Sequence, residues 1–268
     1  MSRVYRTDAN RGGCNRAWGL LASYGGVATP RYLRIGHKGA AALAPENTIA
    51  SLAAALESGV DMVEFDVVDA PDGSLVLAHS QEEIEPGAPD LDEALAFVMS
   101  EAPGTTGLVI DLKGEGFEER IARSLAQHAL TARALVSSFH SQSLRELARY
   151  EPTLRTGISY PWDRRGLATR RAMKPIVWAG AAALRAALPH RIAGMVQGAG
   201  ASSAMLHYSV LSSAAVARCH ELGVSVFAWT VDEPELLGRL LAMNVDGVIS
   251  NDPRIFDASG EPRYDHVR

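Results

Sequence analysis

The feature that most constrains the fold is an alternation of strand-like and helix-like patterns that repeats over residues 32–253. Short apolar segments of strand length are separated by segments in which apolar residues recur with helical period. Such alternation predicts a parallel sheet, and its length suits a single closed (β/α)8 barrel of the TIM type. The nine predicted strands are residues 32–36, 60–67, 75–78, 108–112, 134–137, 154–158, 204–207, 224–229 and 246–250.

Nine strands are one more than such a barrel needs. Asp72-Gly73 predicts a tight turn between the second and third segments, which leaves no room for a crossover helix. One strand is therefore extra, antiparallel or both. A doubly wound open sheet is the alternative architecture, but the glycine-rich phosphate-binding pattern expected after its first strand is absent from the sequence.

Capping residues mark several helix boundaries. Asn47 or Thr48 is expected to cap a helix that Gly59 ends. Asp232 is expected to cap a later helix, with Glu235 three residues on completing a capping box.

Composition limits the classes of protein to which the chain can belong. The 268 residues carry 26 Lys and Arg against 31 Asp and Glu, a formal net charge of −5, which argues against nucleic acid as a partner. A hydrophobic fraction of 47% excludes a wholly disordered chain. The two cysteines, Cys14 and Cys219, can build neither a disulfide framework nor a cysteine zinc cluster. No run approaches the roughly 18 apolar residues of a transmembrane segment.

The alternating pattern predicts one barrel domain over residues 32–256, preceded by an extension (1–31) expected to be loosely ordered and followed by a tail (257–268). Arginines precede a short apolar stretch within the extension, but its glycines, Ser23 and Tyr24 make it a poor signal peptide. A cytoplasmic location is therefore predicted, with export as the less favoured alternative. The pattern predicts no particular oligomeric state.

Charged residues occur at alternate positions near the carboxyl ends of two predicted strands. Residues i and i+2 of a strand point to the same face, so Glu64 shares a face with Asp66, and Asp111 shares one with Lys113. An ordinary half-exposed strand with salt bridges explains either pair alone. Two such pairs in a closed barrel favour a site for one hard divalent cation, because buried carboxylates need a charge partner. Carboxylate oxygens select Mg²⁺, Ca²⁺ or Mn²⁺ over zinc or copper.

Two histidines complete this constellation. His37 directly follows the first strand and His79 the third, so both are expected at the mouth of the barrel, where catalytic groups of this architecture lie. With a cation and with Lys38 and Lys113 beside them, they suit phosphodiester chemistry: one imidazole removes a proton from the nucleophile and the other protonates the leaving alkoxide. The sequence leaves open which histidine has which role. The other histidines have no predicted cation site or lysine pair beside them and are assigned no role. They are His128, His140, His190, His207, His220 and His266.

The order and spacing of these residues resemble a known family, the glycerophosphodiester phosphodiesterases, which belong with the phosphatidylinositol-phospholipase-C-like TIM-barrel phosphodiesterases. The opening motifs of the family are similar to His37-Lys38-Gly39, Pro45-Glu46-Asn47-Thr48, Glu64-x-Asp66, Asp72-Gly73 and His79. Its later motifs are similar to Asp111-x-Lys113, Val136-Ser137-Ser138-Phe139, Trp229-Thr230-Val231-Asp232 and residues 246–253. The resemblance covers essentially residues 32–253.

The resemblance implies a TIM-type barrel that hydrolyses glycerophosphodiesters to glycerol 3-phosphate and an alcohol with the help of a divalent cation. The residue roles that it implies are general acid and base catalysis by His37 and His79, metal binding by Glu64, Asp66 and Asp111, and substrate binding by Lys38, Glu46, Lys113 and Trp229.

The chain departs from the family pattern at four places. Lys38 replaces an arginine, which exchanges a bidentate phosphate fork for a point charge, and Asp111 replaces a glutamate that is one methylene longer. Ser80 stands where the family commonly has aspartate. Only residues 80–110 separate His79 from Asp111, so the small insertion that often carries glycerol contacts is largely missing. This shortened, acidic loop predicts a more open mouth that could admit lysophospholipid-like diesters.

Two other functions are compatible with these residues. A phospholipase D or sphingomyelinase D-like phosphodiesterase acting on lysophospholipids shares the two histidines and three carboxylates, but Pro45-Glu46-Asn47-Thr48 and the lack of paired cysteines disfavour it. A catalytically silent phosphodiester-binding barrel is expected to lose a histidine or a metal carboxylate, and none is lost here. The expected partner is a small-molecule or lysolipid phosphodiester, with no nucleic acid and no membrane-spanning segment.

Overall fold

The computed structural model describes residues 32–102, 104–162 and 174–259. The predicted loose order of residues 1–31 falls outside these ranges, as does most of the predicted tail. The strands in the described ranges are β1 (Leu33–Gly36), β2 (Met62–Asp69), β3 (Leu75–Leu77), β4 (Gly107–Leu112), β5 (Ala134–Ser138), β6 (Arg155–Tyr160), β7 (Ser203–His207), β8 (Ser225–Trp229) and β9 (Gly247–Ser250).

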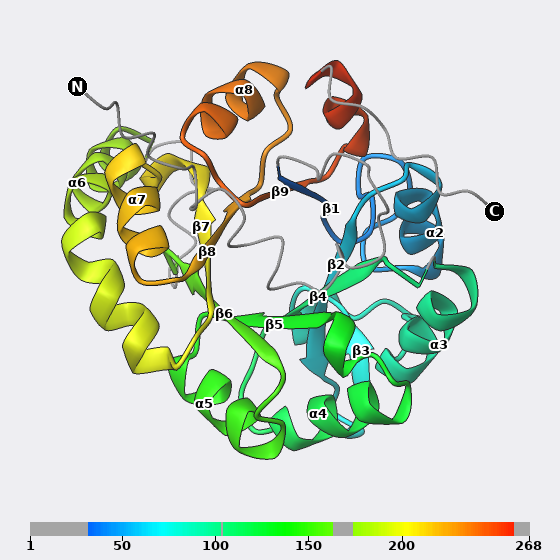
Figure 1. The fold of residues 1–268 in the computed structure, drawn as a ribbon. Helices are drawn as coiled ribbons and strands as arrows, with labels where there is room; N and C mark the ends of the chain where they lie inside the picture. The colour runs from blue at the N-terminus through cyan, green and yellow to red at the C-terminus, as the bar shows by residue number, and fades with distance from the viewer. Residues whose placement is uncertain (1–31, 103, 163–173, 260–268) are drawn as a thin grey trace, which may run out of the picture.

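The sheet closes on itself to form a barrel (Figure 1). Neighbouring strands follow the order β1-β9-β8-β7-β6-β5-β4-β2, and β1 pairs again with β2, where Ile35 lies opposite Met62. Each of these strand pairs is parallel. The closure confirms the predicted (β/α)8 barrel and excludes the open doubly wound sheet.

The extra strand is β3, which is antiparallel as one of the alternatives predicted. It pairs with the end of β2, so that Val68 lies opposite Val76. In the turn between them Asp72 Oδ1 accepts a hydrogen bond of 2.9 Å from the backbone N–H of Ser74. Gly73 has a φ of 83°, a left-handed conformation that glycine adopts at little cost.

Helices surround the barrel on its outer face (Figure 1). They pack on the strands through buried apolar side chains, as Ile121 and Leu125 do from α4. None of the helices in the described ranges combines the length and the apolar character needed to cross a bilayer. The helices are α2 (Ile49–Glu57), α3 (Leu91–Glu101), α4 (Glu118–Gln127), α5 (Ser141–Tyr150), α6 (Lys174–Ala199), α7 (Ser213–Glu221) and α8 (Pro234–Ala242), with 3-10 turns η1 (Gln81–Glu83), η2 (Thr131–Arg133), η4 (Tyr208–Val210) and η5 (Pro253–Ser259).

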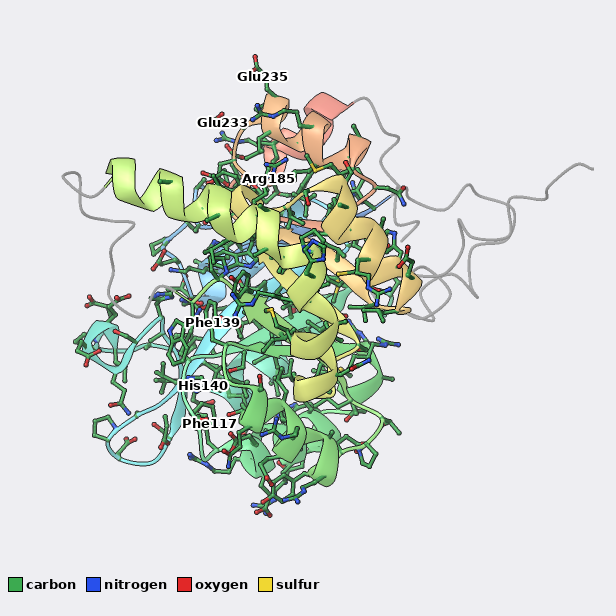
Figure 2. All side chains as sticks on the ribbon, turned by 90° about the vertical axis from the view of Figure 1, so that its left-hand side faces the viewer. Phe117, Phe139, His140, Arg185, Glu233 and Glu235 are labelled. Carbon is green, nitrogen blue, oxygen red and sulfur yellow. The ribbon has the colours of Figure 1, made fainter. Side chains whose placement is uncertain are left out.

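One predicted cap is confirmed and another is wrong. Thr48 caps α2, because its hydroxyl accepts a hydrogen bond of 3.2 Å from the backbone N–H of Ser51. The predicted capping box of Asp232 and Glu235 does not form. Glu233 occupies the cap position of α8, since Pro234 suits the first helical residue, and both glutamates lie exposed at the start of the helix (Figure 2).

Alternate residues of the strands fill the inside of the barrel in layers. One layer is apolar and consists of Leu33, Ile35, Met62, Val109, Leu135, Met205, Phe227 and Ile249. Two residues further along, at the mouth, the same inward face carries polar or aromatic side chains. These are His37, Glu64, Asp111, Ser137, His207, Trp229 and Asn251.

Candidate active site

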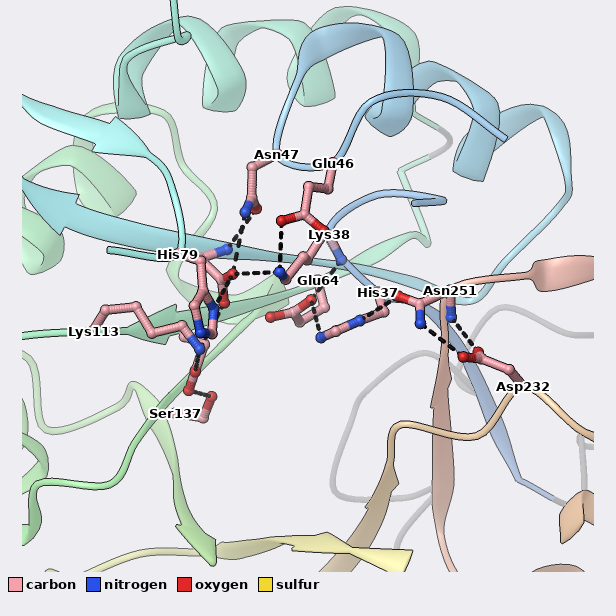
Figure 3. Close-up of polar contacts among 12 residues, drawn as sticks. His37, Lys38, Glu46, Asn47, Glu64, His79, Lys113, Ser137, Asp232 and Asn251 are labelled. Carbon is pink, nitrogen blue, oxygen red and sulfur yellow. Dashed lines mark hydrogen bonds and ion pairs between the residues drawn. The ribbon is translucent and has the colours of Figure 1, made fainter. Parts of the chain in front are cut away.

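The carboxylates predicted to share an inward face meet at the carboxyl ends of β2 and β4. Glu64, Asp66 and Asp111 are all buried, and Asp66 lies directly opposite Asp111 in the parallel pair. The ammonium of Lys113, which Figure 3 labels, contacts both aspartates. Its Nζ lies 2.8 Å from Asp66 Oδ1 and 2.5 Å from Asp111 Oδ2. The i, i+2 pattern on two neighbouring strands thus builds one cluster of charges.

Burial and mutual charge set the protonation of this cluster. Burial alone lowers the pKa of Lys113, but the carboxylates of Asp111 and Asp66 outweigh it and hold this pKa above its usual value. Burial raises the pKa of Asp66, yet Lys113 and the hydrogen bond from His79 hold it well below the usual range. The pKa of Glu64 is raised well above its usual value by burial and by the charges of Asp66 and Asp111. Burial is the larger cause at Glu64, and the two neighbouring carboxylates add to it.

This donor set fits a hard divalent cation. Carboxylate oxygens are the ligands that Mg²⁺ and Ca²⁺ prefer, and a cation would offset the mutual repulsion of Glu64, Asp66 and Asp111, which adds to burial in raising the pKa of Glu64. In the described part of the chain, however, no three His, Cys, Asp or Glu side chains already surround a common metal position. The ammonium of Lys113 lies between Asp66 and Asp111. The fit therefore rests on the chemistry of the side chains.

His37 is oriented by a hydrogen-bonded chain that ends on Asp232 (Figure 3). Its Nδ1 lies 2.6 Å from Asn251 Oδ1, and Asn251 Nδ2 donates to Asp232 Oδ2 over 2.7 Å. A carboxylate only accepts, so the amide nitrogen of Asn251 faces Asp232 and the amide oxygen faces His37. His37 Nδ1 therefore carries the proton, and the lone pair of the neutral ring is on Nε2, 3.9 Å from Glu64 Oε2. Burial lowers the pKa of His37, which favours this neutral form.

His79 has a different environment, since its side chain is 47% exposed. Its Nδ1 lies 3.1 Å from Asp66 Oδ2. Because the lowered pKa of Asp66 keeps that carboxylate ionised, Nδ1 of His79 donates the hydrogen bond. The two histidines are thus held differently, His37 by a neutral amide and His79 by a carboxylate.

Lys38 and Glu46 form the rim beside this cluster. The backbone N–H of Lys38 donates to Glu64 Oε2 over 2.7 Å, and its Nζ lies 2.8 Å from Glu46 Oε1. The same ammonium is 3.8 Å from Asp66 Oδ2. A second ammonium therefore lies next to the carboxylates, as the sequence predicted.

Four residues that contact the predicted site residues, directly or through one neighbour, had no predicted role in the site. Asn47, considered only as a helix cap, donates from Nδ2 to Asp66 Oδ2 over 3.1 Å and accepts from the Asp66 backbone N–H over 3.0 Å. Ser137 donates to Asp111 Oδ1 over 2.5 Å. The other two are Asp232 and Asn251. All four lie inside the family-like motifs, which is the signal that could have found them.

The other half of the barrel mouth is aromatic. Trp229, which the family resemblance implies as a substrate-binding residue, lies at the end of β8. Two strands, β9 and β1, separate β8 from β2 in the barrel. Its ring centroid is 6.1 Å from that of Phe139 and 5.0 Å from that of His207. Phe139 also stacks on Trp162 with a centroid distance of 6.0 Å. In the side view of Figure 2, Phe139 and His140 lie next to each other at the end of β5.

The mouth thus has a charged half, with two histidines and three carboxylates, and an aromatic half. The model of the Glycerophosphoryl diester phosphodiesterase family matches residues 37–92 and 99–255, which is most of the chain. The chain belongs to this family. Membership confirms the resemblance seen in the sequence and the predicted enzyme class, a phosphoric diester hydrolase.

Relatives within the glycerophosphoryl diester phosphodiesterase family match nearly over their full length. The glycerophosphodiester phosphodiesterase of Caldanaerobacter subterraneus subsp. tengcongensis is 28% identical over 264 residues, which cover 82% of this chain and 94% of the relative. The solved glycerophosphodiester phosphodiesterase of Parabacteroides distasonis has a TM-score of 0.66 at 21% identity and covers 87% of this chain and 100% of its own. An Oleispira antarctica phosphodiesterase in complex with the product sn-glycerol-3-phosphate has a TM-score of 0.65 at 23% identity, over 85% and 97% of the two chains. These two structures share the barrel fold.

Proposed function

We propose that this family member hydrolyses glycerophosphodiesters to glycerol 3-phosphate and an alcohol, with His37 as general base and His79 as general acid. The single observation that carries the proposal is the different orientation of the two histidines beside one buried carboxylate cluster. The names of the relatives support the substrate class, and the sn-glycerol-3-phosphate bound to the Oleispira antarctica phosphodiesterase supports the product.

His37 is the proposed base because its hydrogen bond to Asn251 leaves the lone pair on Nε2. That nitrogen takes a proton from the attacking water while the water oxygen forms a new bond to phosphorus. The Asn251 amide and Asp232 then hold the charged imidazolium in place through Nδ1. Asp232 acts through Asn251 and is a positioning residue.

His79 is the proposed acid because its Nδ1 is held by the Asp66 carboxylate, which leaves Nε2 free to face the leaving alcohol. The proton passes from His79 to the alkoxide as the ester bond between phosphorus and the leaving alcohol breaks. The exposure of His79 suits this role, since the alcohol then departs on the open side of the mouth.

Phosphate binding is assigned to the ammonium groups of Lys113 and Lys38, which lie on either side of Asp66. They offset the negative charge that grows on the phosphoryl oxygens. Glu64, Asp66 and Asp111 would hold one divalent cation, Mg²⁺ or Ca²⁺ with Mn²⁺ as a third candidate. When bound, such a cation supplies further positive charge to those oxygens and lowers the pKa of a neighbouring hydroxyl.

The test is an assay of the purified full chain on a panel of glycerophosphodiesters and lysophospholipids, with and without EDTA. We expect release of glycerol 3-phosphate from the glycerophosphodiesters, loss of this activity in EDTA, and its recovery with Mg²⁺, Ca²⁺ or Mn²⁺. Cleavage of lysophospholipids alone would instead support the phospholipase D-like function. Binding of the diesters without cleavage would support the silent barrel, and full activity after metal removal would exclude the cation from the mechanism.

A further inference from the structure

His207 occupies a position in the mouth that its sequence context did not reveal. It ends β7 on the inward face, two residues beyond Met205 of the apolar layer, and lies directly opposite Trp229 in the parallel pair. In the sequence it lacks the surroundings of His37 and His79, a predicted cation site and two lysines, and was therefore predicted to have no role. That interpretation was incomplete, since the structure brings His207 to the aromatic half of the site.

The tautomer of His207 is fixed by the chain that follows it. The backbone N–H of Ser209 donates to His207 Nδ1 over 3.3 Å, and Ser209 Oγ lies 2.8 Å from the same nitrogen. A backbone N–H only donates, so Nδ1 accepts and carries no proton. In the neutral ring the proton is therefore on Nε2. Burial lowers the pKa of His207 and so favours the neutral ring near pH 7.

Two N–H groups in this half of the mouth have no acceptor among the residues that the structure describes. His207 Nε2 makes no hydrogen bond to any residue in the described ranges. Trp229 Nε1 is a buried donor without a partner, in a ring whose centroid is 5.0 Å from that of His207. An unsatisfied buried donor costs about 1–3 kcal/mol, so a ligand oxygen that accepts from it is favoured.

The ligand oxygen at this place is expected to be neutral. The charged groups that suit a phosphate, Lys38 and Lys113, lie on the β1, β2 and β4 side, whereas His207 and Trp229 offer uncharged donors on aromatic rings. Aromatic faces beside N–H donors suit a polyol, which has apolar C–H faces and hydroxyl edges.

We propose that His207 Nε2 and Trp229 Nε1 donate hydrogen bonds to a hydroxyl of the glycerol moiety that is retained in the product. This inference rests on the proposed function, in which the exposed His79 protonates the leaving alcohol. That alcohol departs beside His79, next to the β2–β3 hairpin, so the retained glycerol is the substituent that turns toward β7 and β8. His207 is then a specificity residue that recognises the glycerol moiety, which all glycerophosphodiester substrates share.

Two substrates with one leaving group isolate this contact. The p-nitrophenyl ester of sn-glycerol 3-phosphate carries the glycerol hydroxyls, and p-nitrophenyl propyl phosphate lacks them. Both release p-nitrophenol, so a change in the bond-breaking step affects them alike, and a lost contact to a glycerol hydroxyl affects only the first. If the wild-type protein cleaves neither, the proposed function fails. If it cleaves both, the test addresses His207 alone.

Two variants distinguish the loss of the Nε2 hydrogen-bond donor from the loss of the hydrogen bond between His207 Nδ1 and Ser209. His207→Asn keeps an acceptor for the Ser209 N–H, as asparagine does at many caps, but loses the donor at the Nε2 position. His207→Gln places an amide N–H near that position and loses the hydrogen bond to the Ser209 backbone. We expect His207→Asn to lower kcat/KM about 5- to 50-fold for the glycerol ester, mainly through KM, and to leave the propyl ester unchanged. His207→Gln should recover most of the loss.

Trp229→Phe, which removes the indole N–H and leaves a smaller aromatic ring, should also lower kcat/KM more for the glycerol ester than for the propyl ester. Direct binding of the two phosphate monoesters to the proteins gives a second measurement. sn-Glycerol 3-phosphate should bind His207→Asn more weakly than it binds the wild-type protein, whereas propyl phosphate should bind both proteins equally. Equal losses on the two esters, or a defect in His207→Gln that His207→Asn lacks, would assign His207 a structural role and overturn the proposal. Diesters that carry glycerol or propanol as the leaving alcohol test the other assignment. If the loss of kcat/KM in His207→Asn depends on the hydroxyls of this leaving alcohol, the assignment to the retained glycerol is overturned.

Discussion

Asn251 Oδ1 lies 2.6 Å from His37 Nδ1, although 214 residues separate them in the chain. The contact is a direct result of barrel closure, because β1 pairs with β9 and Gly36 lies opposite Ser250. The residues that follow these two strands therefore meet at the mouth. Closure of the first strand onto the last thus does more than complete the sheet, since it determines which nitrogen of His37 has the lone pair.

Asp232→Asn should disturb this orientation without removing any group that contacts the substrate. Asp232 accepts from both the side chain and the backbone N–H of Asn251, at 2.7 and 2.8 Å. An amide at this position can also donate, so the Asn251 amide becomes free to turn and His37 can take the other tautomer. We expect kcat to fall about 10- to 100-fold with little change in KM or Tm, because a wrong tautomer removes the base but not the binding site.

The matched control is Asp252→Asn. Asp252 is also an aspartate beside β9, but its carboxylate binds the exposed side chain of Arg254 at 2.7 Å and does not reach the His37 chain. Steady-state kinetics of both variants decide the matter. An Asp232→Asn enzyme as active as Asp252→Asn would show that Asp232 does not position His37.

Asp111→Asn should weaken the response to a divalent cation, whereas Asp69→Asn should not. Asp111 is buried in the carboxylate cluster. Asp69 is 41% exposed at the far end of β2 and pairs with Arg120, a surface ion pair worth about 0–1 kcal/mol. We expect the concentration of Mg²⁺ that gives half-maximal activity to rise at least roughly tenfold in Asp111→Asn. Similar metal titrations for the two variants would mean that Asp111 is not a ligand.

The sequence was sufficient for the fold and for the charged half of the site because both depend on short-range periodicity. Alternation with period 2 identifies the inward face of a strand, and so it placed Glu64, Asp66, Asp111 and Lys113 on one surface. Strand ends are equally local, which is why His37 and His79 were expected at the mouth. In each case the residues and their neighbours in sequence contain the information.

The residues that were missed act through contacts between distant segments. Asn47 meets Asp66 across 19 residues, and the side chain of Asp232 meets Asn251 across 19. A local capping signal at Asp232 was misleading, because its carboxylate is already engaged by β9 and the helix starts at Pro234. His207 was missed because its partner is a backbone N–H, which has no signature in the sequence.

The pair of His220 and Asp246 should make stability depend on pH. His220 Nε2 lies 2.9 Å from Asp246 Oδ2, and this hydrogen bond outweighs burial and raises the pKa of His220. Because the pKa of His220 is higher in the folded than in the unfolded protein, the pair stabilises the fold fully below the unfolded-state pKa near 6.5. This stabilisation is lost as the pH rises through the folded-state pKa. We expect the free energy of unfolding to exceed that of His220→Gln by roughly 1 kcal/mol at pH 5.5 and to converge with it at pH 9. Urea denaturation at the two pH values measures this, and a constant difference would contradict it.

The opposite roles of the two histidines predict opposite responses to the leaving group. Alanine at either position should lower kcat on a glycerophosphodiester by roughly 10²–10⁴-fold, and the double variant should be little worse than the poorer single one. A p-nitrophenolate needs no proton when it departs, so the p-nitrophenyl ester of sn-glycerol 3-phosphate should restore most of the rate of His79→Ala. The same ester should leave His37→Ala slow, because the attacking water still needs a base and the imidazole that Asn251 orients is absent. Rescue of His37→Ala in place of His79→Ala would exchange the two roles, and equal rescue of both would refute a division of acid and base between them.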